Sequence, residues 1–335
     1  MNSKKWVRTW IVIVIVIVSI VGGFNYVIDP YGENYHFNHS AINKIKITQD
    51  ERQSKFRYLN NNNNYKTVIL GNSKGTYIDP SIIRKYTGLE AYNASFSAGT
   101  MDEFLKYTEW LINNRNIKQL FIAFDYFSLT EYKSNGVMPS ELRPNDYFKF
   151  DYFSFSKFKA SIKVILHNTN FKEISKERKF YLDKGMRYNA KYFERQNSIN
   201  KQLKHIEFLK SEKIIWHGND ISQERINNLK EIVTLCKENN IKLFLLQTPS
   251  SYRKLNFNSR KNYKKLLSLV KSIAIEIHPV YFFNDFNYVN NNLKYYFDNT
   301  HFNYDVSELI FERVFLDKGI GLKITPSNAY KIDTL

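Results

Sequence analysis

The feature that most constrains this chain is an uncharged, largely apolar run over residues 9–28. A helix needs about 20 such residues to cross the hydrocarbon layer of a bilayer. The alternating isoleucines and valines would suit a strand in water, but in lipid a helix satisfies its own backbone hydrogen bonds. Lys4, Lys5 and Arg8 precede the run. This basic flank predicts a cytoplasmic N-terminus and places everything after Asp29 on the outer side.

A cleaved signal peptide is the alternative interpretation of this run. The run is long for a signal peptide, and no small-x-small site of the Ala-x-Ala kind follows it. We therefore expect a retained single-pass anchor. The predicted layout is a cytoplasmic tip and transmembrane anchor over 1–30, a polar linker over 31–64, a folded domain over 65–320 and a C-terminal tail over 321–335.

Composition restricts the class of protein further. The formal net charge of +17 would usually indicate nucleic acid as a partner. The predicted topology excludes that partner, because the domain lies across the membrane from the cell's nucleic acid. Two interpretations stay open, attraction to anionic lipid or acidic glycan and a solvated surface rich in lysine and asparagine. The single cysteine, Cys236, excludes an intramolecular disulfide, and no motif predicts a metal or another cofactor.

From residue 65 onward, short apolar strands alternate with amphipathic helices. Strands are predicted at 67–70, 90–93, 120–124, 242–246 and 280–283, and helices at 81–86, 101–115, 222–238, 260–275 and 304–315. This alternation is typical of a three-layer, doubly wound α/β fold with a mostly parallel sheet. It stops from about 128 to 220, a stretch rich in Phe, Tyr and Lys that we interpret as a large insertion and a candidate lid.

Residues 71–75, Gly-Asn-Ser-Lys-Gly, directly follow the first strand of this domain. A serine at such a turn projects its hydroxyl at the sheet edge where ligands bind, so Ser73 is a candidate nucleophile. Asn72 and Lys74 are candidate cleft residues beside it. A phosphate loop is excluded because the order of Gly, Lys and Ser differs from the Walker pattern. An ordinary polar turn is the other interpretation.

Asp298 and His301 lie three positions apart, just before the last predicted helix. A serine hydroxyl needs a base to take its proton, and a carboxylate can fix the tautomer of a histidine in that role. A surface turn is the competing interpretation. His278 precedes a proline at a strand entrance and is expected to be structural. The remaining histidines lie in the linker (His36 and His39) or in the insertion (His167, His205 and His217).

A third segment, residues 92–100, follows the second strand and is rich in small and polar residues. Asn93, or backbone N–H groups near Gly99, could complete an oxyanion hole, because small residues let the backbone approach a ligand closely. The segment could equally be a polar turn that caps the next helix. Asp125, at the end of the third strand, either lines the cleft or caps the exit of the chain from the sheet.

Together these segments resemble the SGNH-hydrolase superfamily. The similarity is to its membrane-anchored branch of bacterial surface-polysaccharide proteins, relatives of the alginate O-acetylation proteins and of the teichoic-acid D-alanyl transfer protein. It covers roughly residues 65–316 apart from the insertion. The matching segments are residues 71–74, Asp298 with His301, Tyr92 with Asn93 and Gly99, residues 28–32 and residues 247–249. One block departs, because Phe-Asp-Tyr-Phe at 124–127 replaces the superfamily's Gly-x-Asn-Asp, whose Asn helps to hold the oxyanion.

The resemblance implies a Ser73–His301–Asp298 triad that performs acyl chemistry on a cell-surface or exported polysaccharide, as an O-acyltransferase or an esterase. It also implies the bacterial cytoplasmic membrane as the location, an extracytoplasmic catalytic domain and a membrane-bound protein as acyl donor. The alternative is a non-catalytic glycan-binding or assembly protein on the same fold, with aromatic side chains of the insertion stacking on sugars. The discriminating feature is whether the Ser73 hydroxyl and the His301 ring meet.

Overall fold

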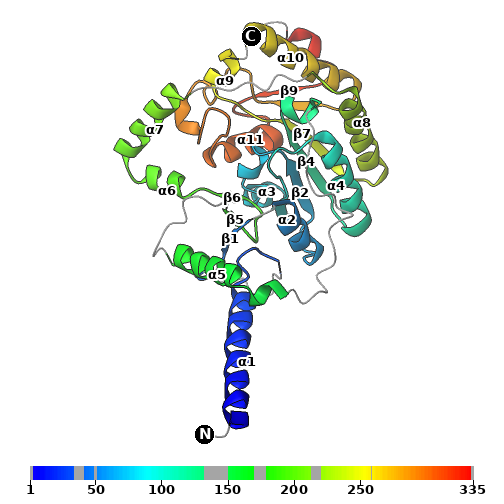
Figure 1. Cartoon of the computed structure of the whole chain (residues 1–335). Coiled ribbons are helices and arrows are strands. Elements are labelled where there is room, and N and C mark those ends of the chain that lie inside the picture. Colours follow the sequence, from blue (N-terminus) through cyan, green and yellow to red (C-terminus); the bar gives the residue numbers. More distant parts are fainter. Residues whose placement is uncertain are drawn as a thin grey trace. The chain divides into compact units, whose positions relative to one another are not determined.

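The structure is a computed structural model (Figure 1). The described residues are 3–33, 41–48, 51–131, 150–169, 179–212, 220–257 and 259–332. The chain divides into two compact units. Residues 1–61 and 142–183 form one, here called the N-terminal unit, and residues 62–141 and 184–335 form the other, here called the sheet unit. The predicted insertion is therefore shared between the two units.

The sheet unit is built, within the described residues, on six strands in the order β3-β2-β4-β7-β8-β9. Every neighbouring pair is parallel except β8 and β9. The strands are β2 (Thr67–Gly71), β3 (Ala91–Asn93), β4 (Gln119–Phe124), β7 (Lys242–Gln247), β8 (Val280–Phe282) and β9 (Leu322–Ile324). The prediction of an α/β fold on a mostly parallel sheet is confirmed.

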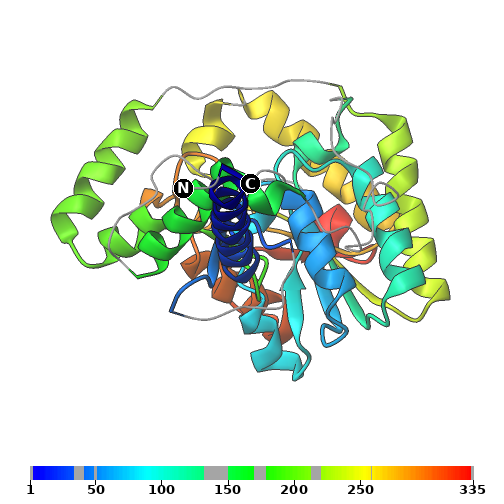
Figure 2. The ribbon, with the colours of Figure 1, turned by 60° about the horizontal axis from the view of Figure 1, so that its bottom comes forward.

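The central strands are buried on both faces, as their unbroken apolar sequences predict. On one face Phe121 of β4 stacks on Phe244 of β7 with ring centroids 4.4 Å apart. Helices α3 and α11 pack against each other, and so do α4 and α8 (Figures 1 and 2). The helices of this unit are α3 (Ser81–Thr87), α4 (Met101–Asn114), α6 (Ala190–Gln196), α7 (Ile199–Ser211), α8 (Gln223–Glu238), α9 (Tyr252–Phe257), α10 (Ser259–Glu276) and α11 (Asp305–Leu316).

The predicted C-terminal tail over 321–335 is wrong in its first part, because β9 belongs to the sheet. Its residues pair antiparallel with β8, with Ile324 opposite Val280. Ile324 is fully buried, and Gly321 makes the entry turn with a φ of +77°. A parallel sheet leaves the outer edge of its last strand unpaired, and β9 covers that edge.

The N-terminal unit begins with α1 (Ser3–Ile28), the one helix in the described residues that is long and apolar enough to cross a membrane. It continues with β1 (Ile45–Ile47), α2 (Glu51–Asn60), the 3₁₀ turn η4 (Phe150–Phe153), α5 (Phe155–Asn168) and β5 (Lys179–Tyr181). Strands β1 and β5 pair antiparallel. The segment 31–64, predicted as a linker, is thus folded in its described part. The segment is polar on average, but α2 has a buried face that includes Phe56 and Leu59.

Polar side chains hold the C-terminal end of α1. Asn43 Nδ2 donates to the carbonyls of Val27 and Ile28, at 3.2 and 3.0 Å. Lys46 Nζ donates to the Ile28 carbonyl at 2.9 Å. A helix leaves its last carbonyls unpaired, and a cation is favourable at that end of the helix dipole. Burial lowers the pKa of Lys46 to about 8, although the charge of Asp29 raises it.

Two glycines with left-handed backbones predict a measurable contrast in stability. Gly185 has φ +67°, and a Cβ there would lie 2.1 Å from the Asn93 carbonyl oxygen. Gly88 has φ +71° and nothing within 4 Å of a Cβ. We expect Gly88→Ala to cost about 1–2 kcal/mol from backbone conformation alone. Gly185→Ala should cost roughly a further 1–3 kcal/mol, because the backbone must also move. Denaturant titration of the full chain in detergent measures both, and equal losses would contradict this packing.

Candidate active site

The Ser73 turn follows β2 at the carboxyl end of the parallel strands. The chain leaves the sheet at Gly71 and enters the 3₁₀ turn η1 (Gly75–Tyr77), so Ser73 lies between two buried elements. The Thr76 hydroxyl donates to the Ser73 carbonyl at 2.6 Å. This local bond holds the turn that places the serine at the sheet edge where ligands bind in such folds.

The loop that carries Asp298 and His301 lies between the 3₁₀ turn η5 (Leu293–Tyr295) and α11. The Phe297 N–H donates to the His301 carbonyl at 2.8 Å. Tyr296 and Phe302 form an isolated antiparallel bridge around it. The loop is therefore closed at its base and presents the residues between as one tight turn.

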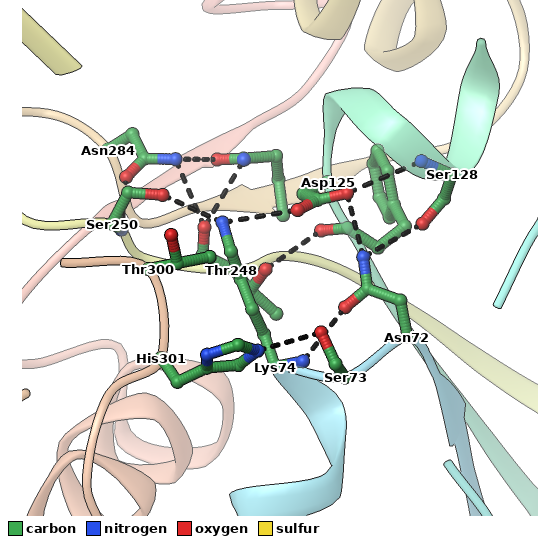
Figure 3. Close-up of polar contacts among 12 residues, drawn as sticks. Asn72, Ser73, Lys74, Asp125, Ser128, Thr248, Ser250, Asn284, Thr300 and His301 are labelled. Carbon is green, nitrogen blue, oxygen red and sulfur yellow. Dashed lines mark hydrogen bonds and ion pairs between the residues drawn. The ribbon is translucent and has the colours of Figure 1, made fainter. Parts of the chain in front are cut away.

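The structure brings the predicted serine, histidine and aspartate together. Figure 3 shows the contact between the Ser73 and His301 side chains. His301 Nε2 lies 2.8 Å from Ser73 Oγ, and His301 Nδ1 lies 2.8 Å from Asp298 Oδ2. The other carboxylate oxygen, Asp298 Oδ1, accepts the backbone N–H groups of Thr300 and His301, each at 2.8 Å. A carboxylate fixed in this way can hold the histidine ring with Nε2 facing the hydroxyl.

The electrostatics of Asp298 favour its ionised form. Burial raises the pKa of this carboxyl, but the hydrogen bond and charge of His301, together with backbone N–H groups, outweigh burial and lower the pKa to about 2. The side chain is still 38% exposed. Asp298 is therefore a carboxylate throughout the ordinary pH range.

The backbone N–H groups of Ser73 and Gly99 are the candidate oxyanion donors. The N–H of Asn72 donates to the Ala123 carbonyl, and that of Lys74 donates to Asn72 Oδ1. The N–H of Ser73, between them, has no hydrogen-bond partner among the described residues, and neither does that of Gly99. Gly99 belongs to the same strand end, because a Cβ on it would lie 3.0 Å from the Gly71 carbonyl oxygen.

The prediction that Asn93 donates to an oxyanion is wrong. Its Nδ2 donates to the carbonyls of Gly75 and Ile78, at 2.8 and 2.7 Å, so both amide protons are used. Its Oδ1 accepts the Ser95 N–H at 3.0 Å, and the residue is fully buried. Asn93 therefore stabilises the 3₁₀ turn η1 that follows Ser73. The segment 92–100 ends as a helix cap, since the Thr100 N–H donates to the Glu103 side chain at 3.2 Å.

A buried charge pair lies directly behind the serine (Figure 3). Lys74 Nζ lies 3.2 Å from Asp125 Oδ2 and donates to Ser250 Oγ at 2.7 Å. Asp125 Oδ1 accepts Asn72 Nδ2 at 2.7 Å and the Ser128 N–H at 3.3 Å. Lys74 is only 4% exposed. Asp125 thus caps the exit of the chain from β4, as one of its two interpretations predicts, and its bond with Asn72 also holds the loop of the serine.

The charge pair is tied to two further strand ends. Ser250, after β7, offers its N–H to Asn284 Oδ1 at 2.7 Å. Asn284, after β8, donates to Gln247 Oε1 at 2.9 Å. Sequence reasoning missed Ser128, Ser250 and Asn284. The signal that could have found the last two is their position directly after parallel strands, because those ends meet at one sheet edge.

Among the other histidines in the described residues, His205 and His278 have backbone carbonyls as hydrogen-bond partners. His205 Nε2 lies 3.0 Å from the Tyr296 carbonyl, and His278 Nε2 lies 3.2 Å from the Leu243 carbonyl. Burial lowers the pKa of both rings. His167 belongs to the N-terminal unit, where burial lowers its pKa to about 4. The remaining histidines, His36, His39 and His217, lie outside the described residues.

Comparison with known proteins gives no family assignment. No protein family and no curated protein matches the sequence. The chain is similar to a Bacteroides fragilis structure named as a candidate acylhydrolase, at 13% identity and a TM-score of 0.40 over 79% of this chain and 97% of that one. It is also similar to a Streptococcus pneumoniae structure named as a candidate platelet activating factor, at 11% identity and a TM-score of 0.37 over 80% of this chain and 90% of that one. At these values the similarity identifies no function.

The buried pair predicts non-additive losses of stability. Lys74→Met leaves the Asp125 carboxylate without its cation, and Asp125→Asn leaves a buried ammonium group. Removing one partner of a buried pair costs about 3–5 kcal/mol. The double variant should lose less than the sum, since neither charge remains and the introduced amide oxygen can still accept from Asn72. Denaturant titrations of the four proteins give the coupling energy, and simple additivity would contradict the pairing.

Asp298 predicts a dependence of stability on pH. Its pKa of about 2 in the folded protein lies below the value of about 3.9 for an unperturbed aspartate. The ionised group therefore contributes stability that is complete above roughly pH 4 and is lost as the pH falls through the folded value. Compared with Asp298→Asn, the wild type should melt higher at pH 7, and the gap should narrow between about pH 4 and 2. A gap that stays constant over that range would contradict the ion pair.

Proposed function

We propose that this chain is a membrane-anchored serine acyl-ester enzyme, with Ser73 as nucleophile, His301 as base and Asp298 as orienting acid. The observation that carries the proposal is the 2.8 Å contact between Ser73 Oγ and His301 Nε2, with Asp298 on the other ring nitrogen. A serine hydroxyl is a poor nucleophile until a positioned base takes its proton. These three groups come from two segments far apart in the chain and converge at one sheet edge.

The reaction follows from these positions. Ser73 Oγ attacks the ester carbonyl while its proton passes to His301 Nε2, and the N–H groups of Ser73 and Gly99 donate to the carbonyl oxygen as it becomes negative. The tetrahedral species collapses to an acyl-serine, and His301 returns the proton to the departing alcohol. A second hydroxyl then gives its proton to His301 and attacks the acyl carbonyl of the acyl-serine. The bond from the acyl carbon to Ser73 Oγ breaks, His301 returns the proton to Ser73 Oγ, and the product leaves as the new ester or, for water, as the acid.

The resemblance to the SGNH hydrolases supports this chemistry and suggests where it takes place. The serine block, the Asp-x-x-His block and the middle glycine of that superfamily all match residues of this site. The block that carries the superfamily's third oxyanion donor has Asp125 in this chain, and Asp125 binds Lys74. The proposed enzyme therefore works with two backbone donors.

The proposed substrate is a cell-surface or exported polysaccharide, and the proposed acceptor of the acyl group is a sugar hydroxyl. The apolar helix α1 and its basic N-terminal flank support a position on the outer side of the bacterial cytoplasmic membrane. The family resemblance supports transfer from a membrane-bound acyl donor. No cofactor enters the proposed reaction.

A glycan-binding or assembly protein on the same fold is the rival function. A binding protein needs polar and aromatic contacts with sugars, but it has no need of a histidine held between a carboxylate and a serine hydroxyl. That hydrogen-bonded arrangement is the specific observation that favours an enzyme.

Ser73→Ala should abolish turnover of an aryl acetate by the full chain in detergent. Loss of the nucleophile should lower the rate by roughly a thousandfold or more, because the remaining groups no longer form an acyl intermediate. The release of the chromogenic phenol gives the rate. Ser211→Ala, at the exposed end of α7, is the matched control and should keep wild-type activity. Equal activity of the Ser73 variant and the wild type would reject the proposed nucleophile.

A further inference from the structure

Helix α5 of the N-terminal unit carries large apolar side chains on an exposed face. Phe155 is 67% exposed and Ile162 is 38% exposed. Lys159 and Lys163 are exposed on the same side, since Lys159 lies four positions after Phe155, and Ile162 and Lys163 lie three and four positions after Lys159. Exposed apolar side chains that share one side of a helix with lysines are the pattern of an amphipathic helix at a membrane interface.

Helix α5 also packs on the C-terminal end of α1 (Figure 1). The rings of Phe158 and Phe24 have centroids 5.3 Å apart. Asn25, fully buried in α1, accepts the Ser161 hydroxyl at 2.8 Å and donates to the Tyr152 carbonyl at 2.5 Å. These contacts hold α5 and η4 against the last turns of α1, around Phe24 and Asn25.

The length of α1 indicates where these last turns lie relative to the hydrocarbon layer. Residues 9–21 have no fully buried member, whereas Gly22, Asn25 and Ile28 are buried by the rest of the unit. Residues 9–21 span only about 20 Å at the helical rise. The hydrocarbon layer is about 30 Å thick, so its outer boundary falls near residues 22–28. Since α5 packs on that stretch, it lies at the outer boundary of the layer.

The charges at this level suit an anionic surface. Lys159 Nζ lies over the Phe155 ring, 4.7 Å from its centroid. Among the described residues, two acidic groups beside α5, Glu33 and Asp151, are paired with the buried Lys157, at 2.6 and 3.1 Å. Exposed lysines with apolar stems next to aromatic rings are the composition of helices that lie in the headgroup region.

We propose that α5 is an interfacial helix that docks on the outer surface of the bilayer crossed by α1. Phe155 and Ile162 enter the boundary between headgroups and acyl chains, and Lys159 and Lys163 contact anionic lipid phosphates. The inference depends on α1 spanning the membrane and is independent of the proposed triad chemistry. It gives the N-terminal unit a second membrane contact beside the anchor.

The test uses the full chain with Cys236→Ala, reconstituted in vesicles of phosphatidylcholine and phosphatidylglycerol. A cysteine placed at Phe155 or Ile162 carries an environment-sensitive fluorophore, and spin-labelled lipids act as quenchers. Asn60→Cys, at the exposed end of α2, is the matched control in the same unit. We expect blue-shifted emission and lipid quenching at Phe155 and Ile162 and neither at Asn60.

Three other outcomes would overturn the proposal. Emission at Phe155 typical of water would mean that the face is solvated. A blue shift without lipid quenching would mean that protein, such as a second copy of the chain, covers it. Quenching that is unchanged by Lys159→Gln with Lys163→Gln, or by removing the anionic lipid, would overturn the assignment of anionic headgroups. Turnover of an aryl acetate is measured on the same samples. It tests the proposed enzyme function independently of the fluorescence, which tests the membrane contact of α5.

Discussion

The arrangement of the site depends on one pair of hydrogen bonds, those that join the His301 ring to Ser73 on one side and to Asp298 on the other. They connect a turn after the first central strand with a loop before the last helix. The parallel sheet makes this possible, because the carboxyl ends of its strands meet at one edge. The fold thus supplies proximity, and the short Asp-x-x-His turn supplies orientation.

Behind the serine, two charged side chains, Lys74 and Asp125, are largely removed from water, which is unfavourable by itself. That loss of hydration is offset only if each side chain finds several partners. They do so by linking the ends of β2, β4 and β7 through Asn72 and Ser250. A hydrophobic pair would stabilise the fold as well or better. The charged network instead holds the loop of the nucleophile from behind, where a small displacement would separate Ser73 from its base.

The sequence predicted the parts that local patterns determine. Apolar strands such as residues 120–124 have no other stable place than a buried sheet, and a serine after the first strand and a histidine before the last helix fall at the same edge. Asn93 was assigned wrongly, because a small polar residue after a strand can turn outward to a ligand or inward to the backbone, and only the packed turn decides. β9 was missed since three residues carry no periodic signal, and its stability comes from pairing with β8.

Mass spectrometry after reaction with a fluorophosphonate probe shows whether His301 activates the Ser73 hydroxyl. An activated serine forms a covalent adduct with such a probe, whereas an ordinary surface serine does not. Trypsin releases residues 67–74, a peptide in which Ser73 is the only serine. We expect the phosphonyl mass on this peptide in the wild type and its loss in His301→Gln. An unlabelled peptide under conditions that label a known serine esterase, or equal labelling in the His301 variant, would contradict it.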